Sequence, residues 1–148
     1  MRSPLPSRGI SVAAPRAPSL VVRSTPDVVA ALDAVAAAME RQGYPSRDVF
    51  GVRLALEEAL VNALKHGHGY DPAKRARVRY RVTRRQVLAE VADQGPGFDP
   101  AAVPDPLTAD GLGRPSGRGL LLMRHYLSWV RHNRRGNRVT LCRRRSRP

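Results

Sequence analysis

Cysteine is nearly absent from this sequence of 148 residues, and long apolar runs are missing altogether. The single Cys142 excludes an intrachain disulfide and a metal site built from several cysteines. No stretch of about 18 uncharged apolar residues occurs, and residues 1–15 lack a continuous apolar segment, so neither a membrane span nor a secretory signal is supported. We therefore expect a cytoplasmic protein without a membrane partner.

Aromatic residues and lysines are also scarce. Aromatics make up 5% of the chain, which leaves few rings to stack on nucleobases and predicts a core of Ala, Val and Leu. Lys and Arg total 26 against 12 Asp and Glu, a net charge of +14, and Lys65 and Lys74 are the only lysines. The arginine-rich stretches 77–85 and 143–147 could contact phosphate, but such stretches are usually solvated faces. We expect that role, and the dispersed charge argues against a nucleic-acid partner.

The first half of the sequence predicts a strand followed by two helices. Residues 1–18 are rich in proline and read as a flexible leader, and 19–24 has the β-branched character of a strand. Thr25 is the expected cap of a helix that ends at Gly43, and Ser46 is the expected cap of a longer helix reaching about His66. Apolar residues at helical spacing define the buried faces: Val28, Leu32, Val35 and Met39 in the first helix, and Val49, Val52, Leu56, Leu60 and Ala63 in the second.

The second half predicts mostly strands. Apolar residues alternate with arginines over 76–82, and further strands are expected at 87–92, 128–132 and 138–142, the last two forming a hairpin. A long polar loop covers 93–118, and 119–127 has helical spacing. This order predicts an α+β two-layer sandwich with the helices on one face of a mostly antiparallel sheet. We expect one domain over 19–144, after the leader 1–18 and before a basic tail 145–148.

The second predicted helix carries polar residues on a face distinct from its apolar face. Glu58, Asn62 and either Lys65 or His66 recur three or four residues apart, so they can share that face. A carboxylate and a carboxamide one turn apart offer oxygen ligands to a divalent cation, or to a water that the carboxylate deprotonates. The same spacing is also typical of an exposed helix surface, although Asn is a poor helix former and needs a reason to lie mid-helix.

Two glycine-containing segments are further candidates. In 93–100, Asp93 follows an apolar strand and can accept a hydrogen bond from an exocyclic amine, and Gly95 and Gly97 allow close approach of a flat ligand. In 115–123 a glycine-rich loop enters a helix, where free N–H groups and the helix dipole favour phosphates. Taken singly, the first segment could be an ordinary turn and the second an ordinary helix start.

Together and in this order, the E-x-x-x-N helix, the D-x-G-x-G turn and the G-x-G helix start resemble the N, G1 and G2 boxes of the GHKL ATPase superfamily. The segments Asn-Ala-Leu-Lys-His-Gly and Leu-Leu-Leu-Met are most similar to those of the bacterial anti-sigma factor serine/threonine kinases. The resemblance covers about 19–144 and implies a Bergerat-type histidine kinase-like ATPase fold.

The resemblance also implies roles for individual residues. Glu58 would be the catalytic general base, Asn62 would bind Mg²⁺, and Asp93 would read the adenine amine of ATP. The remaining residues implied to contact the nucleotide come from the same three boxes: Lys65, His66, Gly95, Gly97, Phe98, Ser116, Gly117, Arg118, Gly119 and Leu120.

The function implied by the resemblance is regulatory. The chain would be a Mg²⁺- and ATP-dependent serine/threonine protein kinase, an anti-sigma factor that binds a sigma factor and phosphorylates an antagonist protein. The alternative is a non-catalytic ATP-binding module for partner switching. The resemblance also allows a homodimer, for which the sequence shows no interface.

Overall fold

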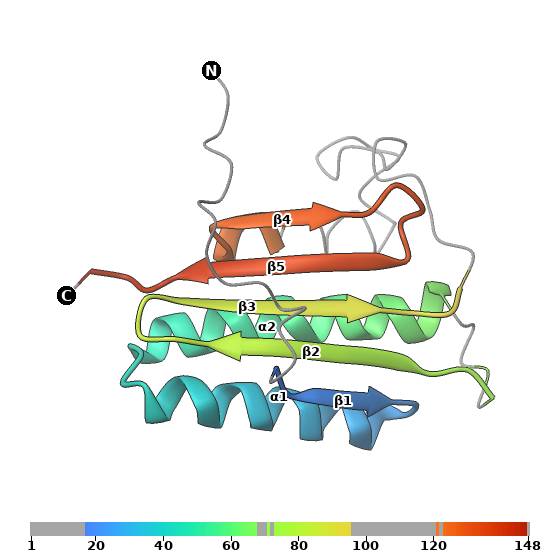
Figure 1. Cartoon of the computed structure of the whole chain (residues 1–148), viewed down its shortest axis with the longest axis horizontal. Helices are drawn as coiled ribbons and strands as arrows, with labels where there is room; N and C mark the ends of the chain where they lie inside the picture. Colours follow the sequence, from blue (N-terminus) through green and yellow to red (C-terminus); the bar gives the residue numbers. More distant parts are fainter. Residues whose placement is uncertain (1–16, 68–70, 72, 96–120, 122, 148) are drawn as a thin grey trace.

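The computed structural model describes residues 17–67, 71, 73–95, 121 and 123–147. Two long helices, α1 (Thr25–Arg41) and α2 (Ser46–Asn62), cover one face of a five-stranded sheet (Figure 1). Their apolar sides and the facing side of the sheet form one core. None of the helices in these ranges is long and apolar enough to cross a membrane.

The sheet is antiparallel throughout. Its strands lie in the order β1-β2-β3-β5-β4, and every neighbouring pair runs antiparallel. The strands are β1 (Ser19–Val22), β2 (Ala76–Val82), β3 (Gln86–Ala92), β4 (Trp129–His132) and β5 (Arg138–Arg144). The expected α+β sandwich, its strands and its closing hairpin are confirmed.

Helix α1 buries the face that its sequence predicted. Leu32, Val35 and Met39 are 4%, 1% and 0% exposed. The N-cap is Ser24 rather than Thr25, so the expected cap was wrong by one residue; no cap side chain bonds the backbone here, and Asp27 accepts a hydrogen bond from the Arg23 N–H (2.8 Å). The helix ends before Gly43, whose φ of +74° suits glycine at this turn.

Helix α2 differs from its sequence prediction at both ends. Pro45, not Ser46, is the N-cap, and it has no side-chain capping hydrogen bond, so the predicted serine cap was wrong. The α-helix stops at Asn62, and the chain continues as a π-helical segment, η1 (Ala63–Gly67). Ala63 and Leu64 in η1 are buried, which fixes this segment in the core.

A close contact joins α2 to the helical residues 123–126. Gly51 is buried in α2, and a Cβ added there would lie 3.1 Å from Tyr126 Cδ1. The absence of a side chain at Gly51 therefore lets Tyr126 lie directly on the helix. Met123, only 2% exposed, joins the core from the same turn. Of the predicted helix 119–127, these residues are helical, and much of the rest lies outside the described residues.

A buried carboxylate connects the start of α2 to the end of β5. Asp48 is 0% exposed and pairs with the Arg143 guanidinium (2.9 Å), and it also accepts hydrogen bonds from the backbone and hydroxyl of Ser146. Arg143 in turn donates to the Tyr126 carbonyl (2.9 Å). Burial alone raises the pKa of Asp48, but the hydrogen bonds from Ser146 and Arg143 outweigh it and hold the pKa below its ordinary value.

The C-terminal arginines are not uniformly solvated. Besides the buried pair of Arg143, Arg145 donates to the Gln42 carbonyl (2.8 Å) and to the Gly43 carbonyl, and its guanidinium lies 5.1 Å from the centre of the Tyr44 ring. The expectation that this stretch only keeps a strand solvated was wrong for two of its arginines. Arg143 joins β5 to the start of α2, and Arg145 joins the segment after β5 to the α1–α2 connection.

We expect Asp48→Asn to lower the free energy of unfolding at neutral pH by about 3 kcal/mol, near the lower end for a broken buried ion pair because Arg143 keeps partial access to water. Asp33→Asn is the matched control: it breaks an exposed pair with Arg53 (2.8 Å), worth less than about 1 kcal/mol. Urea unfolding followed by circular dichroism measures both, and equal losses would contradict the role of Asp48.

The same pair predicts a pH dependence. Because the folded-state pKa of Asp48 is lowered, its contribution is complete above the unfolded-state pKa and is lost as the pH falls through the folded-state pKa. The parent protein should therefore lose stability on acidification below about pH 4, and Asp48→Asn should lose less over the same interval.

Candidate functional site

The polar face of α2 brings together three of the predicted residues. Glu58 is half-buried, and the Asn62 side chain lies close enough to its carboxylate to stabilise the charged form. The exposed Lys65 lies close enough for its charge to act on Glu58. The i, i+4 spacing in the sequence therefore places these side chains near one another.

The environment of Glu58 adjusts its proton affinity. Burial raises the pKa of Glu58 above its ordinary value, and the charge of Glu57 raises it further, whereas the Asn62 hydrogen bond and Lys65 lower it. Burial is the largest of these effects, so the net direction is upward. A partly buried carboxylate with a raised pKa is suited to accepting a proton.

Asn62 provides a second kind of group at this position. Its amide N–H₂ is the only part that can donate to the Glu58 carboxylate, so its carbonyl oxygen stays an acceptor. Mg²⁺ is usually held by one or two protein oxygens, with phosphates and waters completing its shell. The donor set of Glu58 and Asn62 fits such a shared site, and the described residues contain no cluster of three or more His, Cys, Asp or Glu side chains that would hold a metal alone.

The change from α-helix to π-helix falls immediately after Asn62. Segments of π-helix are rare and occur frequently at functional sites, where they redirect the side chains of one helical turn. Lys65 and His66 belong to η1, although the side chain of His66 is outside the described part of the structure. No sequence pattern predicted this change, because residues 63–66 continue the helical spacing.

Asp93 begins a tight turn at the end of β3. Its Oδ1 accepts a hydrogen bond from the Gly95 N–H (2.7 Å), and its own N–H donates to the Asn137 carbonyl (2.9 Å). Gly95 is buried, and the side chain of Gln94 accepts from the Arg75 N–H (2.9 Å). The turn is thus attached to the segments on both sides of β3. Asn137 and Gln94 were not singled out in the sequence, because their contacts depend on strand pairing.

The polar face of α2 and the Asp93 turn lie toward the same end of the sheet, where the central strand β3 ends. Figure 1 shows the end of α2 beside the end of β3. This arrangement brings two of the three sequence boxes together, although they are separated along the chain. The other predicted contacts lie outside the described residues: Gly97, Phe98, Ser116, Gly117, Arg118, Gly119 and Leu120.

Comparison with known proteins identifies the class to which this fold and site belong. Residues 22–143 match the histidine kinase-like ATPase domain, and the chain belongs to this family. The match extends from β1 to β5 and confirms the resemblance to the GHKL ATPases.

Individual relatives are protein kinases. The chain is 33% identical over 105 residues to the serine/threonine-protein kinase BtrW of Bordetella bronchiseptica, covering 68% of this chain and 74% of that protein. It is 31% identical over 85 residues to the serine-protein kinase RsbW of Bacillus velezensis, covering 49% of this chain and 53% of the relative. RsbW of Bacillus licheniformis is 34% identical over 59 residues, covering 40% and 37%.

The interactions around Glu58 predict opposite shifts in two variants. Asn62→Ala removes a hydrogen bond that stabilises the carboxylate and should raise the Glu58 pKa further. Glu57→Gln removes a repelling charge and should lower it toward the ordinary value. An NMR titration of the Glu58 side-chain carboxyl carbon measures both shifts, and an unchanged pKa in Asn62→Ala would contradict the contact.

Proposed function

We propose that this chain is a Mg²⁺- and ATP-dependent serine/threonine protein kinase that acts as an anti-sigma regulatory factor and phosphorylates an antagonist protein. The observation that carries the proposal is the Glu58–Asn62 pair, a half-buried base candidate beside a carboxamide oxygen, at the end of the sheet where the Asp93 turn lies. Membership of an ATPase family and the named kinases among its relatives support it.

Asp93 is the residue that we propose recognises the base by a hydrogen bond. Its Oδ1 is held by the Gly95 N–H, which fixes the orientation of the carboxylate at the end of β3. An acceptor oriented in this way selects a base with an exocyclic amine. The buried Gly95 leaves no side chain beside it, which favours a flat ligand. Gly97 and Phe98 are the proposed continuation of this pocket.

Glu58 and Asn62 are the proposed reaction centre. Mg²⁺-ATP would supply the transferable phosphoryl group and the charge neutralisation that phosphoryl transfer needs. Asn62 would hold the cation through its carbonyl oxygen. Glu58 would accept the proton of the attacking serine or threonine hydroxyl, for which its raised pKa is favourable. Lys65 would add positive charge near the phosphates, with His66 and residues 116–120 as further proposed contacts.

The proposed partners are proteins. The relatives are named as serine- and serine/threonine-protein kinases, which supports a hydroxyl-bearing protein substrate. The sigma factor, the antagonist and a homodimeric state follow from the family resemblance, and we propose a cytoplasmic location for the same reason.

Base recognition can be tested with Asp93→Asn. Asparagine keeps an oxygen for the Gly95 N–H but presents N–H₂ in place of the second carboxylate oxygen, so ATP binding should weaken by about 1–3 kcal/mol. Isothermal titration calorimetry with ATP and with inosine triphosphate, which lacks the amine, provides the control. The parent should prefer ATP and the variant should lose that preference. Equal binding of both nucleotides by the parent would overturn the assignment.

The chemical step can be tested with Glu58→Gln. The amide has nearly the same shape but cannot accept the hydroxyl proton, so phosphotransfer should fall by about 10²–10⁴-fold while Mg²⁺-ATP binding is retained. Glu40→Gln is the matched control, because Glu40 is exposed on α1 and does not act on Glu58, so it should leave transfer intact. Transfer to candidate antagonist proteins is read by mass spectrometry.

The outcomes separate the proposal from its alternative. If the parent binds Mg²⁺-ATP but phosphorylates no candidate antagonist, the chain is a non-catalytic ATP-binding module for partner switching. If Glu58→Gln transfers phosphate at the parent rate, the base assignment is wrong.

A further inference from the structure

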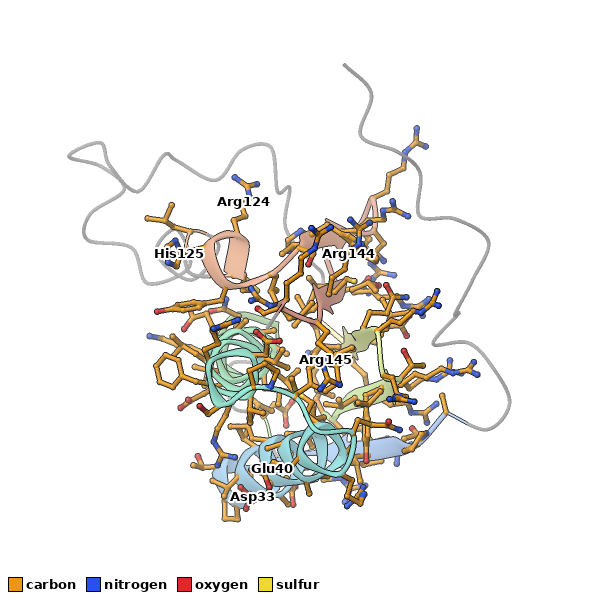
Figure 2. The ribbon with its side chains drawn as sticks, turned by 90° about the vertical axis from the view of Figure 1, so that its left-hand side faces the viewer. Asp33, Glu40, Arg124, His125, Arg144 and Arg145 are labelled. Carbon is orange, nitrogen blue, oxygen red and sulfur yellow. The ribbon has the colours of Figure 1, made fainter. Side chains whose placement is uncertain are left out.

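The sheet has a second face, opposite the helices, that the proposed function does not use. On β2, Ala76 and Val78 are buried in the core, so the alternating Arg77, Arg79 and Arg81 lie on this second face. Figure 2 shows nitrogen-tipped side chains standing out from the sheet on the side away from the helices.

Strands β4 and β5 add arginines to the same face. Directly paired residues of an antiparallel sheet point to the same side. In one row across the sheet, Arg77 pairs with Ala92, and Ala92 pairs with Arg138. In the next row, Arg79 pairs with Glu90, Glu90 with Thr140, and Thr140 with Arg131. Arg144 lies opposite Gln86 on this face. Three strands therefore contribute six arginines, which we call the arginine face: Arg77, Arg79, Arg81, Arg131, Arg138 and Arg144.

The arginine face has little charge to neutralise it. Glu90 is the one carboxylate that the described residues place there, and its side chain is 13% exposed and lies 3.9 Å from Arg138 Nε. The acidic side chains at Asp33, Glu40 and Glu57 belong to the helices on the other side. Like charges on neighbouring strands repel one another, so this face gains from an anion that spans several strands.

The composition of the arginine face indicates which kind of anion it binds. Its apolar side chains are largely covered: Leu88 is 5% exposed and Cys142 0%, and the half-buried Trp129 has the Arg131 guanidinium 5.3 Å from its ring centre. Val21, 44% exposed, lies at the margin on β1. Protein interfaces generally have an apolar centre depleted in charge, whereas nucleic-acid interfaces are polar and strongly positive.

We propose that the arginine face binds the phosphate backbone of nucleic acid without sequence preference, a partner that the sequence alone did not favour because its arginines look dispersed until the strands pair. Guanidinium groups bind phosphate oxygens through two parallel N–H donors, and strand spacing distributes them in two dimensions over the sheet. The coverage of Trp129 by Arg131 leaves contacts to the backbone, not base stacking, as the basis of binding. The face lies on the opposite side of the sheet from α2, so nucleotide and nucleic acid bind independently.

The test is fluorescence anisotropy of the full-length chain with a short labelled DNA duplex of mixed sequence. Dissociation constants between about 1 and 100 µM are expected near physiological salt. If each of the six arginines neutralises one phosphate, the logarithm of the association constant should fall with the logarithm of the salt concentration with a slope of about −5.

Two triple variants with the same change in net charge locate the binding. Arg77→Gln/Arg81→Gln/Arg131→Gln removes three exposed side chains from the arginine face and should make the slope shallower by about three. The control, Arg41→Gln/Arg47→Gln/Arg124→Gln, removes three exposed arginines from the helical elements and should keep the parent slope. Arg124 stands on the helical turn, away from the sheet (Figure 2). Circular dichroism and ATP binding are measured for each variant.

Each outcome decides the proposal. A shallower salt dependence in the Arg77/Arg81/Arg131 variant, with the parent slope in the control variant, supports the proposal. Equal losses in both triples would show a general charge effect and overturn it, as would an absence of duplex binding. Binding of polyglutamate as tightly as the duplex, lost in the first triple, would replace nucleic acid by an acidic protein surface. Because ATP binding is followed separately, failure of the proposed kinase function does not alter any of these results.

Discussion

The buried pair of Asp48 and Arg143 is the constraint on which the arrangement of helix and sheet depends. A fully buried carboxylate is tolerated only when donors surround it, and here the donors come from Arg143 and Ser146 at the end of β5. Arg143 also donates to the carbonyl of Tyr126, whose side chain lies against Gly51 of α2. One cluster therefore fixes the start of α2 relative to the sheet and to the turn before β4.

The candidate site is at the other end of the same helix. Glu58 lies almost three turns and Asn62 almost four turns beyond Asp48, so the angle at which α2 is anchored decides where their side chains lie relative to β3. Structural and chemical roles are thus separated along one element. At the first end, the carboxylate of Asp48 is paired and its pKa is lowered. At the second end, the pKa of Glu58 is raised. Burial acts on both, and the number of hydrogen-bond donors decides the direction.

The sequence was most informative where structure is local. Alternation in Ala76–Val82 predicted β2, and the spacing of Val28, Leu32, Val35 and Met39 predicted the buried face of α1, because each pattern repeats with the period of its element. The proximity of Glu58 and Asn62 could be predicted for the same reason, because the two residues are one helical turn apart. The Asp48–Arg143 pair joins residues 95 positions apart, and the arginine face depends on the register of three strands. No local pattern carries such information, and the π-helical turn is likewise selected by packing.

The sequence distance within the Asp48 cluster has a consequence for the order in which the protein acquires its structure during synthesis. Ribosomes add about 5–20 residues per second, so Asp48 emerges roughly 5–20 s before Arg143. Over that interval α2 has a carboxylate whose final donors do not yet exist, and β3 lacks the neighbour β5 that completes its pairing. The contacts that fix the start of α2 against the sheet therefore form only after the last strand has been synthesised, whereas the contacts of the helices with β1, β2 and β3 do not depend on it.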